Sequence, residues 1–365
     1  MVMKGLSIVS KGIEDVAKLE IKEILGCDSV VDKGCLIFNV KKKEELIMLS
    51  YKAQSCDRVI KLLDKFSFKK EPFDHIKKSL SKIKLPEGSY KVLSIRKGEH
   101  SFNSDNVMKE IGGYLNNKGF DIDLRNSDNV LVIYIVDGEC YVGLDMVDLD
   151  LHKREYRIFM TPSDIRGTVA YAMVRLGGFK DGEIFLDPFC NSGTVVIEAA
   201  LFSLGKSVRY YQKSKFPEIE FNDKLEETKS KIIAVDANHR NIVSTKKNSK
   251  IAGVVKEITF SRSDVEWMDI KFDKKKIDRI VTKLPDLRKD GNKDKMVKIF
   301  DEFFYNSEYV LSDKGSIVIM SESIEVIKPL LEKYHLEISD EREVETGKDK
   351  RHIYLIKKSS SSLKA

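Results

Sequence analysis

The sequence predicts a protein of several domains, with α+β units in its N-terminal half and a mainly parallel α/β sheet in its C-terminal half. The 365 residues are more than one hydrophobic core usually spans, which favours two or three packed units. Strand and helix patterns are mixed up to about residue 148, whereas strand, loop and helix alternate regularly from Glu183 onward. Hydrophobic residues make up 42% and charged residues 33% of the chain, as in a folded protein with a well-solvated surface.

The first predicted unit covers residues 1–65. Residues 6–9 have the pattern of an apolar strand, and an amphipathic helix follows and ends at Gly26. Two short strands are expected at 30–31 and 35–38, and helical periodicity returns over 43–63. This order of elements predicts a small α+β sandwich.

The second predicted unit covers residues 66–148. A Lys-rich helix is expected at 73–83 and a strand at 90–95. The next helix begins near Ser104, which is a good N-cap residue. Further strands are expected at 120–124, 130–136 and 141–144.

The C-terminal half has the pattern of a doubly wound sheet. Four short apolar runs, at 184–186, 232–235, 258–260 and 277–281, are separated by helical patterns, which is typical of parallel strands. Strands at 316–320 and 352–357, with a helix at 326–334 between them, are expected to form a hairpin-like edge.

The composition excludes several classes of protein. The 64 Lys and Arg exceed the 58 Asp and Glu by only six, so a polyanionic partner would need basic residues gathered on one face. The five cysteines show no Cys-x-x-Cys spacing for zinc or redox chemistry, which favours a reducing cytoplasm. No apolar run reaches the roughly 18 residues of a membrane span, and charges interrupt the N-terminus where a signal peptide is apolar. We therefore expect a cytoplasmic protein without a metal site that neither spans a membrane nor is secreted.

A candidate cofactor loop follows the first of the four strands. Asp187 ends the strand, Ser192-Gly193-Thr194 form a tight turn, and a helix begins there. Gly193 lets a ligand approach the backbone, and the helix N-terminus offers N–H groups to a carboxylate such as that of a methionine moiety. A phosphate-loop GKS or GKT and a dinucleotide-type G-x-G-x-x-G are both missing.

Acidic residues also follow the next two strands. Asp236 ends the second strand, where a carboxylate can accept from both hydroxyls of a ribose. Asp264 follows the third strand, where it can accept from an adenine amino group. Any one of these carboxylates is equally typical of a turn or a helix start. The ordered set of three, counting Asp187, favours an adenosine pocket.

These motifs resemble those of the THUMP-containing tRNA guanine-N2 methyltransferases, especially the archaeal type that acts in the acceptor stem. RKGEHSF at 96–102 and the segment 120–145 resemble a THUMP domain, and LHKREYRI at 151–158 resembles the family's junction segment. TPSDIRGTVAYAMVRL at 161–176 resembles the helix before the methyltransferase core. LDPFCNSGTVVIEAAL at 186–201 resembles its first motif, with Asn191 in place of a usual Gly. The resemblance covers residues 1–357.

The resemblance implies a domain order, a cofactor and a partner. It implies a ferredoxin-like domain (1–65), a THUMP domain (66–148), a junction (149–165) and a Rossmann-like class I methyltransferase domain (166–358), before a tail (359–365) that we expect to be disordered. S-adenosylmethionine would be the cofactor. The partner would be tRNA, bound through its acceptor stem and 3′ end and methylated at position 6, and we expect a monomer. The implied cofactor-binding residues are Thr161, Asp187, Phe189, Cys190, Asn191, Ser192, Gly193, Thr194, Asp236, Ala237, Asp264 and Val265.

Basic residues concentrate between positions 69 and 100, as binding to the end of an RNA helix would need. A lysine-rich stretch is also typical of an ordinary solvated surface, and the basic residues at 152–157 would serve equally well to cap a linker between domains. The residues expected to bind RNA are Arg96, Lys97, His100, Lys153 and Arg154.

The candidate catalytic residues are Lys283, Leu284, Pro285 and Asp286, which follow the fourth strand. At the position of Lys283 the family has Asn or Asp, and at that of Asp286 an aromatic residue that stacks on the flipped base. Lysine has no hydrogen-bond acceptor, although an exocyclic amine needs acceptors to orient its lone pair.

Two hypotheses follow from this altered loop. In the first, the protein methylates guanine with Thr282 or Asp286 as the replacement acceptor, and another residue such as Phe159 or Tyr305 stacks on the base. In the second, it binds cofactor or RNA without catalysis. Cytosine-C5 methylation is disfavoured, because it needs a thiolate beside the base and Cys190 sits in the cofactor turn. A small-molecule methyltransferase is disfavoured by the long N-terminal half.

Overall fold

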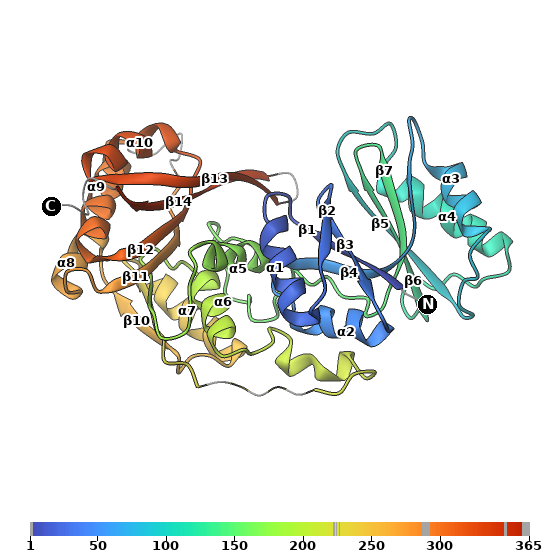
Figure 1. Cartoon of the computed structure of the whole chain (residues 1–365), viewed down its shortest axis with the longest axis horizontal. Coiled ribbons are helices and arrows are strands. Elements are labelled where there is room, and N and C mark those ends of the chain that lie inside the picture. The colour runs from blue at the N-terminus through green and yellow to red at the C-terminus, as the bar shows by residue number, and fades with distance from the viewer. Residues whose placement is uncertain are drawn as a thin grey trace. The chain divides into compact units, whose positions relative to one another are not determined.

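The computed structural model describes residues 3–221, 223, 225, 227–286, 293–346 and 349–359 (Figure 1). The chain divides into two compact units. Unit 1 consists of Met1–Val9, Ala17–Leu151 and Tyr211–Glu220, and unit 2 of Ser10–Val16, His152–Tyr210 and Phe221–Ala365. Beyond Ser359, the expected disordered tail lies outside the described residues.

The N-terminal part of unit 1 has the ferredoxin-like order of elements that the family resemblance implied. Its strands lie in the order β2-β3-β1-β4, and all neighbours are antiparallel. Residues 56–63 were predicted to be helical and are instead strand, because they pair with β1 on one side and β7 on the other. The elements are β1 (Met3–Val9), α1 (Glu14–Leu25), β2 (Ser29–Asp32), β3 (Cys35–Val40), α2 (Lys43–Lys52) and β4 (Cys56–Ser67).

The rest of unit 1 extends the same sheet. Strand β7 pairs antiparallel with β4 and β6, and β6 pairs parallel with β5, so the sheet runs β2-β3-β1-β4-β7-β6-β5. The two predicted N-terminal domains thus share one sheet, and β4 crosses their expected boundary. Helix α4 is capped by Asn103 rather than by Ser104, and the predicted strand at 120–124 is only a bridge between Tyr90 and Ile122. The elements are α3 (Phe73–Leu80), β5 (Tyr90–Lys97), α4 (Ser104–Asn117), β6 (Asn129–Val136) and β7 (Glu139–Asp145).

Unit 2 contains the predicted, mainly parallel sheet. Its order is β10-β9-β8-β11-β12-β14-β13, in which the first five strands are parallel and β14 is antiparallel to both of its neighbours. The elements, after α5 (Gly167–Leu176), are β8 (Ile184–Asp187), α6 (Thr194–Ser203), β9 (Lys231–Asp236), α7 (His239–Ala252), β10 (Ile258–Arg262), η2 (Val265–Trp267), α8 (Met268–Lys271), β11 (Ile277–Lys283), α9 (Lys293–Val310), β12 (Leu311–Met320), α10 (Ile324–Lys333), β13 (Leu336–Thr346) and β14 (Asp349–Lys358). The 3-10 turn η1 (Tyr210–Lys215) belongs to unit 1 except for its first residue.

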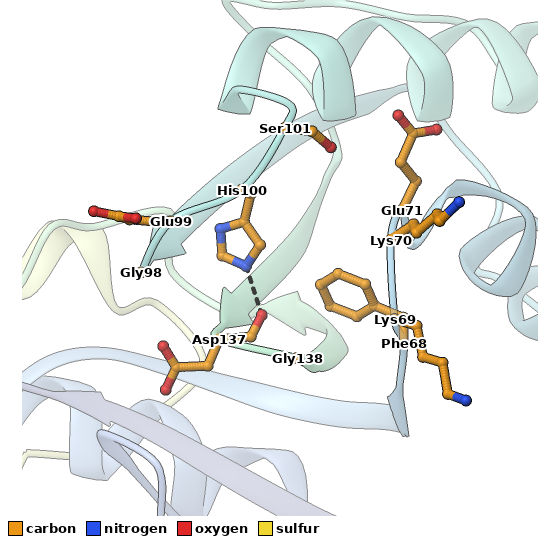
Figure 2. Close-up of a pocket in the computed structure, with 10 residues that line it drawn as sticks. All are labelled: Phe68, Lys69, Lys70, Glu71, Gly98, Glu99, His100, Ser101, Asp137 and Gly138. Carbon is orange, nitrogen blue, oxygen red and sulfur yellow. Dashed lines mark hydrogen bonds between the residues drawn. The ribbon is translucent and has the colours of Figure 1, made fainter.

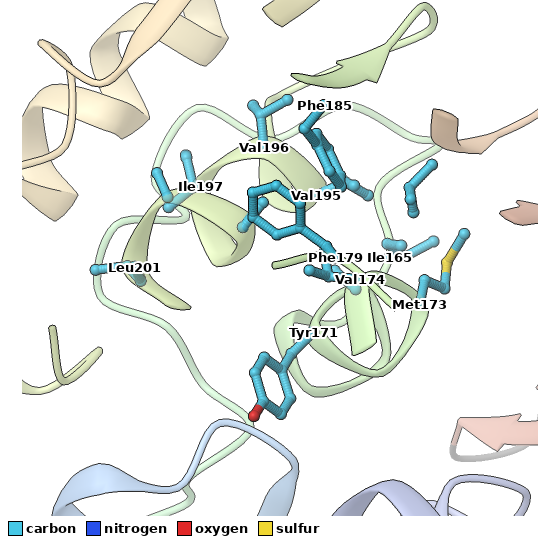
Figure 3. Packing of buried hydrophobic residues seen from close by; sticks show 14 of the residues in the cluster. Ile165, Tyr171, Met173, Val174, Phe179, Phe185, Val195, Val196, Ile197 and Leu201 are labelled. Carbon is cyan, nitrogen blue, oxygen red and sulfur yellow. The ribbon is translucent and has the colours of Figure 1, made fainter. Parts of the chain in front are cut away.

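The hydrophobic core of unit 2 fixes α5 and α6 against the sheet. Figure 3 shows this cluster. Val174 of α5, Phe179 in the segment after α5, and Phe185 of β8 lie beside Val196 and Ile197 of α6. Removing such apolar side chains from water stabilises the fold by about 1.5–3 kcal/mol for each large residue. The packing holds the end of β8 in place, and the cofactor loop begins at that end.

The strand order places a ligand crevice in unit 2. The chain winds from β8 to β9 in one direction and returns to the other side of β8 at β11. In open α/β sheets, ligands bind at such a reversal, beyond the carboxyl ends of the strands. None of the helices that the structure describes is long and apolar enough to cross a bilayer.

Candidate functional site

The ends of β8 and β11 are joined by a buried hydrogen bond. Thr282 donates its hydroxyl to Asp187 Oδ1 at 2.6 Å, and the Phe189 N–H donates to the same oxygen at 3.2 Å. Asp187 is only 1% exposed, and this burial raises the pKa of its carboxyl to about 7. The two hydrogen bonds act in the opposite direction, because they stabilise the ionised form.

The cofactor loop has the tight conformation that its sequence predicted. Asn191 and Gly193 have φ angles of +49° and +88°, and the Cys190 N–H donates to the Val235 carbonyl at 3.0 Å, so the loop is tied to β9. A Cβ at Gly193 would lie 2.5 Å from the methyl group of Thr245, which excludes any larger residue. Cys190 is buried, and burial raises the pKa of its thiol well above the usual range.

Asp236 holds the loop from the end of β9. Its Oδ2 accepts from the Asn191 N–H at 3.0 Å and from the Asn241 amide at 3.0 Å, and its Oδ1 accepts from the Asn238 N–H at 2.8 Å. Burial raises the pKa of Asp236, against the effect of these hydrogen bonds. A carboxylate has about four lone-pair sites, so little acceptor capacity is left for a ribose, and that role for Asp236 stays a prediction.

The residues expected around an adenine follow Asp236 in the sequence, directly after β9 and after β10. Asp264 is exposed and accepts from the Val265 N–H at 2.7 Å, so it also caps η2. Ala237 is exposed, and its carbonyl accepts from Arg262 at 3.3 Å. The contact with Val265 is one that any aspartate in a turn could make. Because Asp264 is exposed, its carboxylate can still accept a hydrogen bond from a ligand.

Asp164 connects two predicted cofactor residues and was missed by the sequence analysis. Its carboxylate accepts from the Thr161 N–H at 2.9 Å, from the Thr161 hydroxyl at 2.8 Å and from the Ser192 hydroxyl at 2.6 Å. It thereby ties the segment before α5 to the cofactor loop. The only sequence signal for this role is its place in the segment that resembles the family.

Asn248 is a second residue that the sequence analysis missed. From the buried face of α7 its amide donates to the carbonyls of Ser192 and Phe159, at 2.9 and 3.1 Å, and its oxygen accepts from the Phe159 N–H at 3.0 Å. Phe159, one of the two proposed stacking residues, is thus fixed next to the cofactor loop. Tyr305, the other, packs edge-on against Tyr334.

The loop after β11 contains a buried cation. Lys283 is 4% exposed, and its Nζ donates to Asp286 Oδ2 at 2.7 Å. Arg351 Nη1 lies 3.7 Å from Asp286 Oδ1, and the Leu284 N–H donates to the Met320 carbonyl at 3.1 Å. Asp286 and Pro285 are more exposed than the residues before them.

One small pocket brings the two predicted loops together. It is lined by residues of the segment before α5, by the cofactor loop and by Lys283 of the β11 loop. The predicted cofactor residues Asp264 and Val265 do not line it. Among the described residues no group of His, Cys, Asp and Glu could hold a metal ion. The predicted site residues that line the pocket are Asp187, Phe189, Cys190, Asn191, Thr194 and Lys283.

The predicted RNA-binding residues of unit 1 lie at one end of its sheet. His100 binds the Asp137 carbonyl through one ring nitrogen and Arg96 through the other, and it lines an open pocket together with Lys69 and Lys70 (Figure 2). The Lys97 ammonium donates to the Val9 carbonyl at 2.9 Å. His100 thus lies in a pocket that Lys69 and Lys70 share with the acidic residues Glu71, Glu99 and Asp137. The Lys97 ammonium uses one of its hydrogen-bond donors within the protein.

Arg154 is a correction to the predicted RNA-binding set. Its side chain is fully buried, donates to Glu198 Oε1 at 2.8 Å and cannot reach a phosphate in this fold. Tyr156 donates to the same carboxylate at 2.6 Å, and the charge of Arg154 is therefore used to anchor the junction segment on α6. Lys153 is exposed and stays a predicted RNA contact.

Comparisons with known proteins agree with this architecture. A model of the RMKL-like methyltransferase domain matches residues 154–352, more than half of the chain, and a THUMP domain model matches residues 73–145. The tRNA (guanine(6)-N2)-methyltransferase of Methanocaldococcus jannaschii is 28% identical over 367 residues, which cover 93% of this chain and 96% of that protein. The enzyme of the same name from Archaeoglobus fulgidus is 26% identical, with 95% and 90% covered.

Among solved structures, TrmN from Thermus thermophilus has a similar fold. The TM-score is 0.75 at 19% sequence identity, and the match covers 98% of this chain and 99% of that one. This likeness confirms the predicted fold, with a mainly parallel C-terminal sheet.

Proposed function

Because the chain belongs to the RMKL-like methyltransferase family and also carries a THUMP domain, we propose that it transfers a methyl group from S-adenosylmethionine to N2 of a guanosine in tRNA, at position 6 of the acceptor stem. Two relatives whose names state that reaction align with more than nine-tenths of the chain. The observation that carries the proposal is a pocket lined both by the cofactor loop and by Lys283 at the end of β11.

The residues of the cofactor loop fit S-adenosylmethionine. Gly193 keeps the backbone open, and the Thr194 hydroxyl is a buried donor without a hydrogen-bond partner among the described residues. The N-terminus of α6 offers N–H groups to the carboxylate of the methionine moiety. A ligand with a net positive charge would favour the ionised forms of Asp187 and Asp236, whose pKa values are raised by burial.

The β11 loop would orient the guanine amine. The bound cofactor supplies an electrophilic methyl group, and the sulfur keeps the electron pair of the broken S–C bond. Asp286 accepts a hydrogen bond from the amine and takes up the proton that the nitrogen loses as its bond to the methyl carbon forms. Thr282 is less suited to this role, because it is fully buried and its hydroxyl already donates to Asp187.

Unit 1 would hold the tRNA. The pocket with Lys69, Lys70 and His100 lies in the THUMP-containing part of this unit and presents donors for phosphates. We propose that it takes the acceptor stem and 3′ end, and that the protein acts in the cytoplasm as a monomer.

A second function is favoured by one observation. Lys283 occupies the position at which the family has an acceptor, and a buried lysine needs a counter-ion, which Asp286 provides. In this reading the protein binds S-adenosylmethionine and tRNA and transfers no methyl group.

One experiment separates the two functions. The purified protein is incubated with unmodified tRNA and methyl-labelled S-adenosylmethionine, and the labelled nucleoside is identified after digestion by mass spectrometry. We expect N2-methylguanosine at position 6. Binding of both cofactor and tRNA without incorporation of label would establish the non-catalytic function instead.

A further inference from the structure

The Asp286 carboxylate lies between two cationic side chains. Lys283 Nζ is 2.7 Å from Oδ2, and Arg351 Nη1 is 3.7 Å from Oδ1. Arg351, on β14, is also 3.6 Å from Glu322, just after β12. Ion pairs from β11 and β14 thus hold the carboxylate from both sides.

These contacts leave part of the carboxylate free to bind a ligand. An ionised carboxylate offers about four lone-pair sites, and among the described residues only the Lys283 contact to Asp286 is within hydrogen-bond distance. The Asp286 side chain is 46% exposed, whereas the Lys283 side chain is 4% exposed. The remaining acceptor sites can therefore be reached from solvent, next to the pocket that Lys283 and Asp187 line.

We propose that Asp286 reads the Watson–Crick edge of the target guanine, accepting N1–H with one oxygen and N2–H with the other. This inference rests on the proposed function and names how the site selects its base. Guanine presents two parallel donors on this edge, and an ionised carboxylate presents two parallel acceptors. Adenine presents the acceptor N1 beside its amino group, so the carboxylate would repel it. Arg351 and Lys283 are then positioning residues, because they hold Asp286 and do not contact the base.

An ion pair that only neutralises Lys283 would explain the same distances, so the test must depend on the hydrogen-bond pattern of the base. The base 2-aminopurine keeps the N2 amine of guanine and has an acceptor at N1. Substitution Asp286→Asn replaces one acceptor oxygen by a donor, which matches N1 of 2-aminopurine and clashes with N1–H of guanine.

The experiment compares tRNAs with guanosine or 2-aminopurine at the nucleotide that the wild-type protein methylates. We expect wild type to favour guanosine by about 100-fold in kcat/KM, as mismatched hydrogen-bonding groups in a site commonly cost that much or more. Asp286→Asn cannot take up the proton of the amine, so its kcat/KM is expected to be low, and we expect the residual kcat/KM to show no preference for guanosine or a reversed one. If no residual activity is measurable, the preference is compared by binding of guanosine 5′-monophosphate and 2-aminopurine riboside 5′-monophosphate. An equal preference for guanosine in wild type and Asp286→Asn would overturn the inference.

Arg351 gives an independent test of positioning. We expect Arg351→Ala to lower the preference for guanosine, and Arg351→Lys to retain most of it, while the KM for S-adenosylmethionine stays constant in both. Arg342→Ala is the matched control, because Arg342 also forms ion pairs with aspartates but makes none with Asp286 among the contacts described. A preference that is unchanged in Arg351→Ala would contradict the positioning role.

Failure of the proposed function would be recognised separately. If wild type methylates no tRNA, binding of guanosine 5′-monophosphate and of 2-aminopurine riboside 5′-monophosphate is measured by calorimetry for wild type and Asp286→Asn. A change of preference between the two proteins would support the reading of guanine by Asp286 even though methylation had failed. The same preference in both proteins would overturn it.

Discussion

Thr282 and Asp187 meet at 2.6 Å where β11 and β8 end, and both are fully buried. Thr282 precedes the β11 loop and Asp187 opens the cofactor loop, so this hydrogen bond sets the spacing of the two loops. If this donor were lost, Oδ1 would keep the hydrogen bond from the Phe189 N–H, and the loss of one hydrogen bond costs about 0.5–1.5 kcal/mol. The bond therefore couples the loop after β8 to the loop after β11.

The first prediction concerns pH. Burial raises the pKa of Asp187 from an ordinary 3.8 to about 7. Below the pKa of the unfolded chain, the carboxyl is protonated in both states and does not lower the free energy of unfolding. As pH rises from there through about 7, the unfolded chain ionises more readily than the folded one, and the free energy of unfolding falls. We expect Asp187→Asn to raise the free energy of unfolding by ~1–2 kcal/mol at pH 8, with a difference that shrinks towards pH 4.

This prediction is measured by denaturant unfolding of both proteins across that pH range. Asp181→Asn is the control, because Asp181 is exposed and its pKa is lowered. A stability difference between Asp187→Asn and wild type that stays constant with pH would show that Asp187 does not titrate in this range.

The second prediction concerns the cofactor turn. Gly193→Ala should abolish binding of S-adenosylmethionine, since the new Cβ would lie 2.5 Å from Thr245 at a φ of +88°. Gly182→Ala is a matched control, because Gly182 has a φ of +89° and nothing lies within 4 Å of its Cβ position. Calorimetric titration with the cofactor gives the readout, and equal affinities for the two variants would rule out the steric argument.

The third prediction concerns the buried Arg154–Glu198 pair. Arg154→Met would leave Glu198 charged and buried, and we expect a loss of about 3 kcal/mol in the free energy of unfolding. Lys153→Met, at the exposed neighbouring position, should change it by less than about 0.5 kcal/mol. Thermal and denaturant unfolding check both values. Comparable losses in the two variants would mean that Arg154 is not a structural anchor.

The fourth prediction concerns RNA binding by unit 1. Replacing Lys69 and Lys70 by Ala should weaken tRNA binding and reduce the slope of log K against log salt by about 1.5, since each phosphate contact contributes about 0.7–0.9. Exposed Lys250 and Lys256 of unit 2 serve as the control pair. Binding titrations at several salt concentrations measure the slopes. Equal slopes for both double variants would place the RNA elsewhere.

The sequence predicts the parts of the site that depend on local chemistry. The turn at Gly193 and the acidic ends of β8 and β9 follow from residue types next to apolar strands. Asp164 and Asn248 could not be predicted, because their roles come from hydrogen bonds with Ser192. Ser192 is 28 residues from Asp164 and 56 residues from Asn248 along the chain.

The differences between the predicted and the observed secondary structure also come from contacts between distant parts of the chain. The apolar residues of β4 suit a helix as well as a strand, and pairing with β1 and β7 decides the outcome. Strand β13 is rich in charged residues and is defined by its pairing with β14 at the sheet edge. Arg154 shows that the sequence cannot distinguish a buried, paired arginine from one that faces RNA.

The most direct test of the central claim is the yield of N2-methylguanosine per protein molecule in a single-turnover reaction with unmodified tRNA. We expect close to one equivalent from wild type, and a rate at least about 100-fold lower for Asp286→Ala, since that variant lacks the acceptor for the amine. If wild type binds both the cofactor and the tRNA yet forms no N2-methylguanosine, the loop from Lys283 to Asp286 is not catalytic and the proposed activity is wrong.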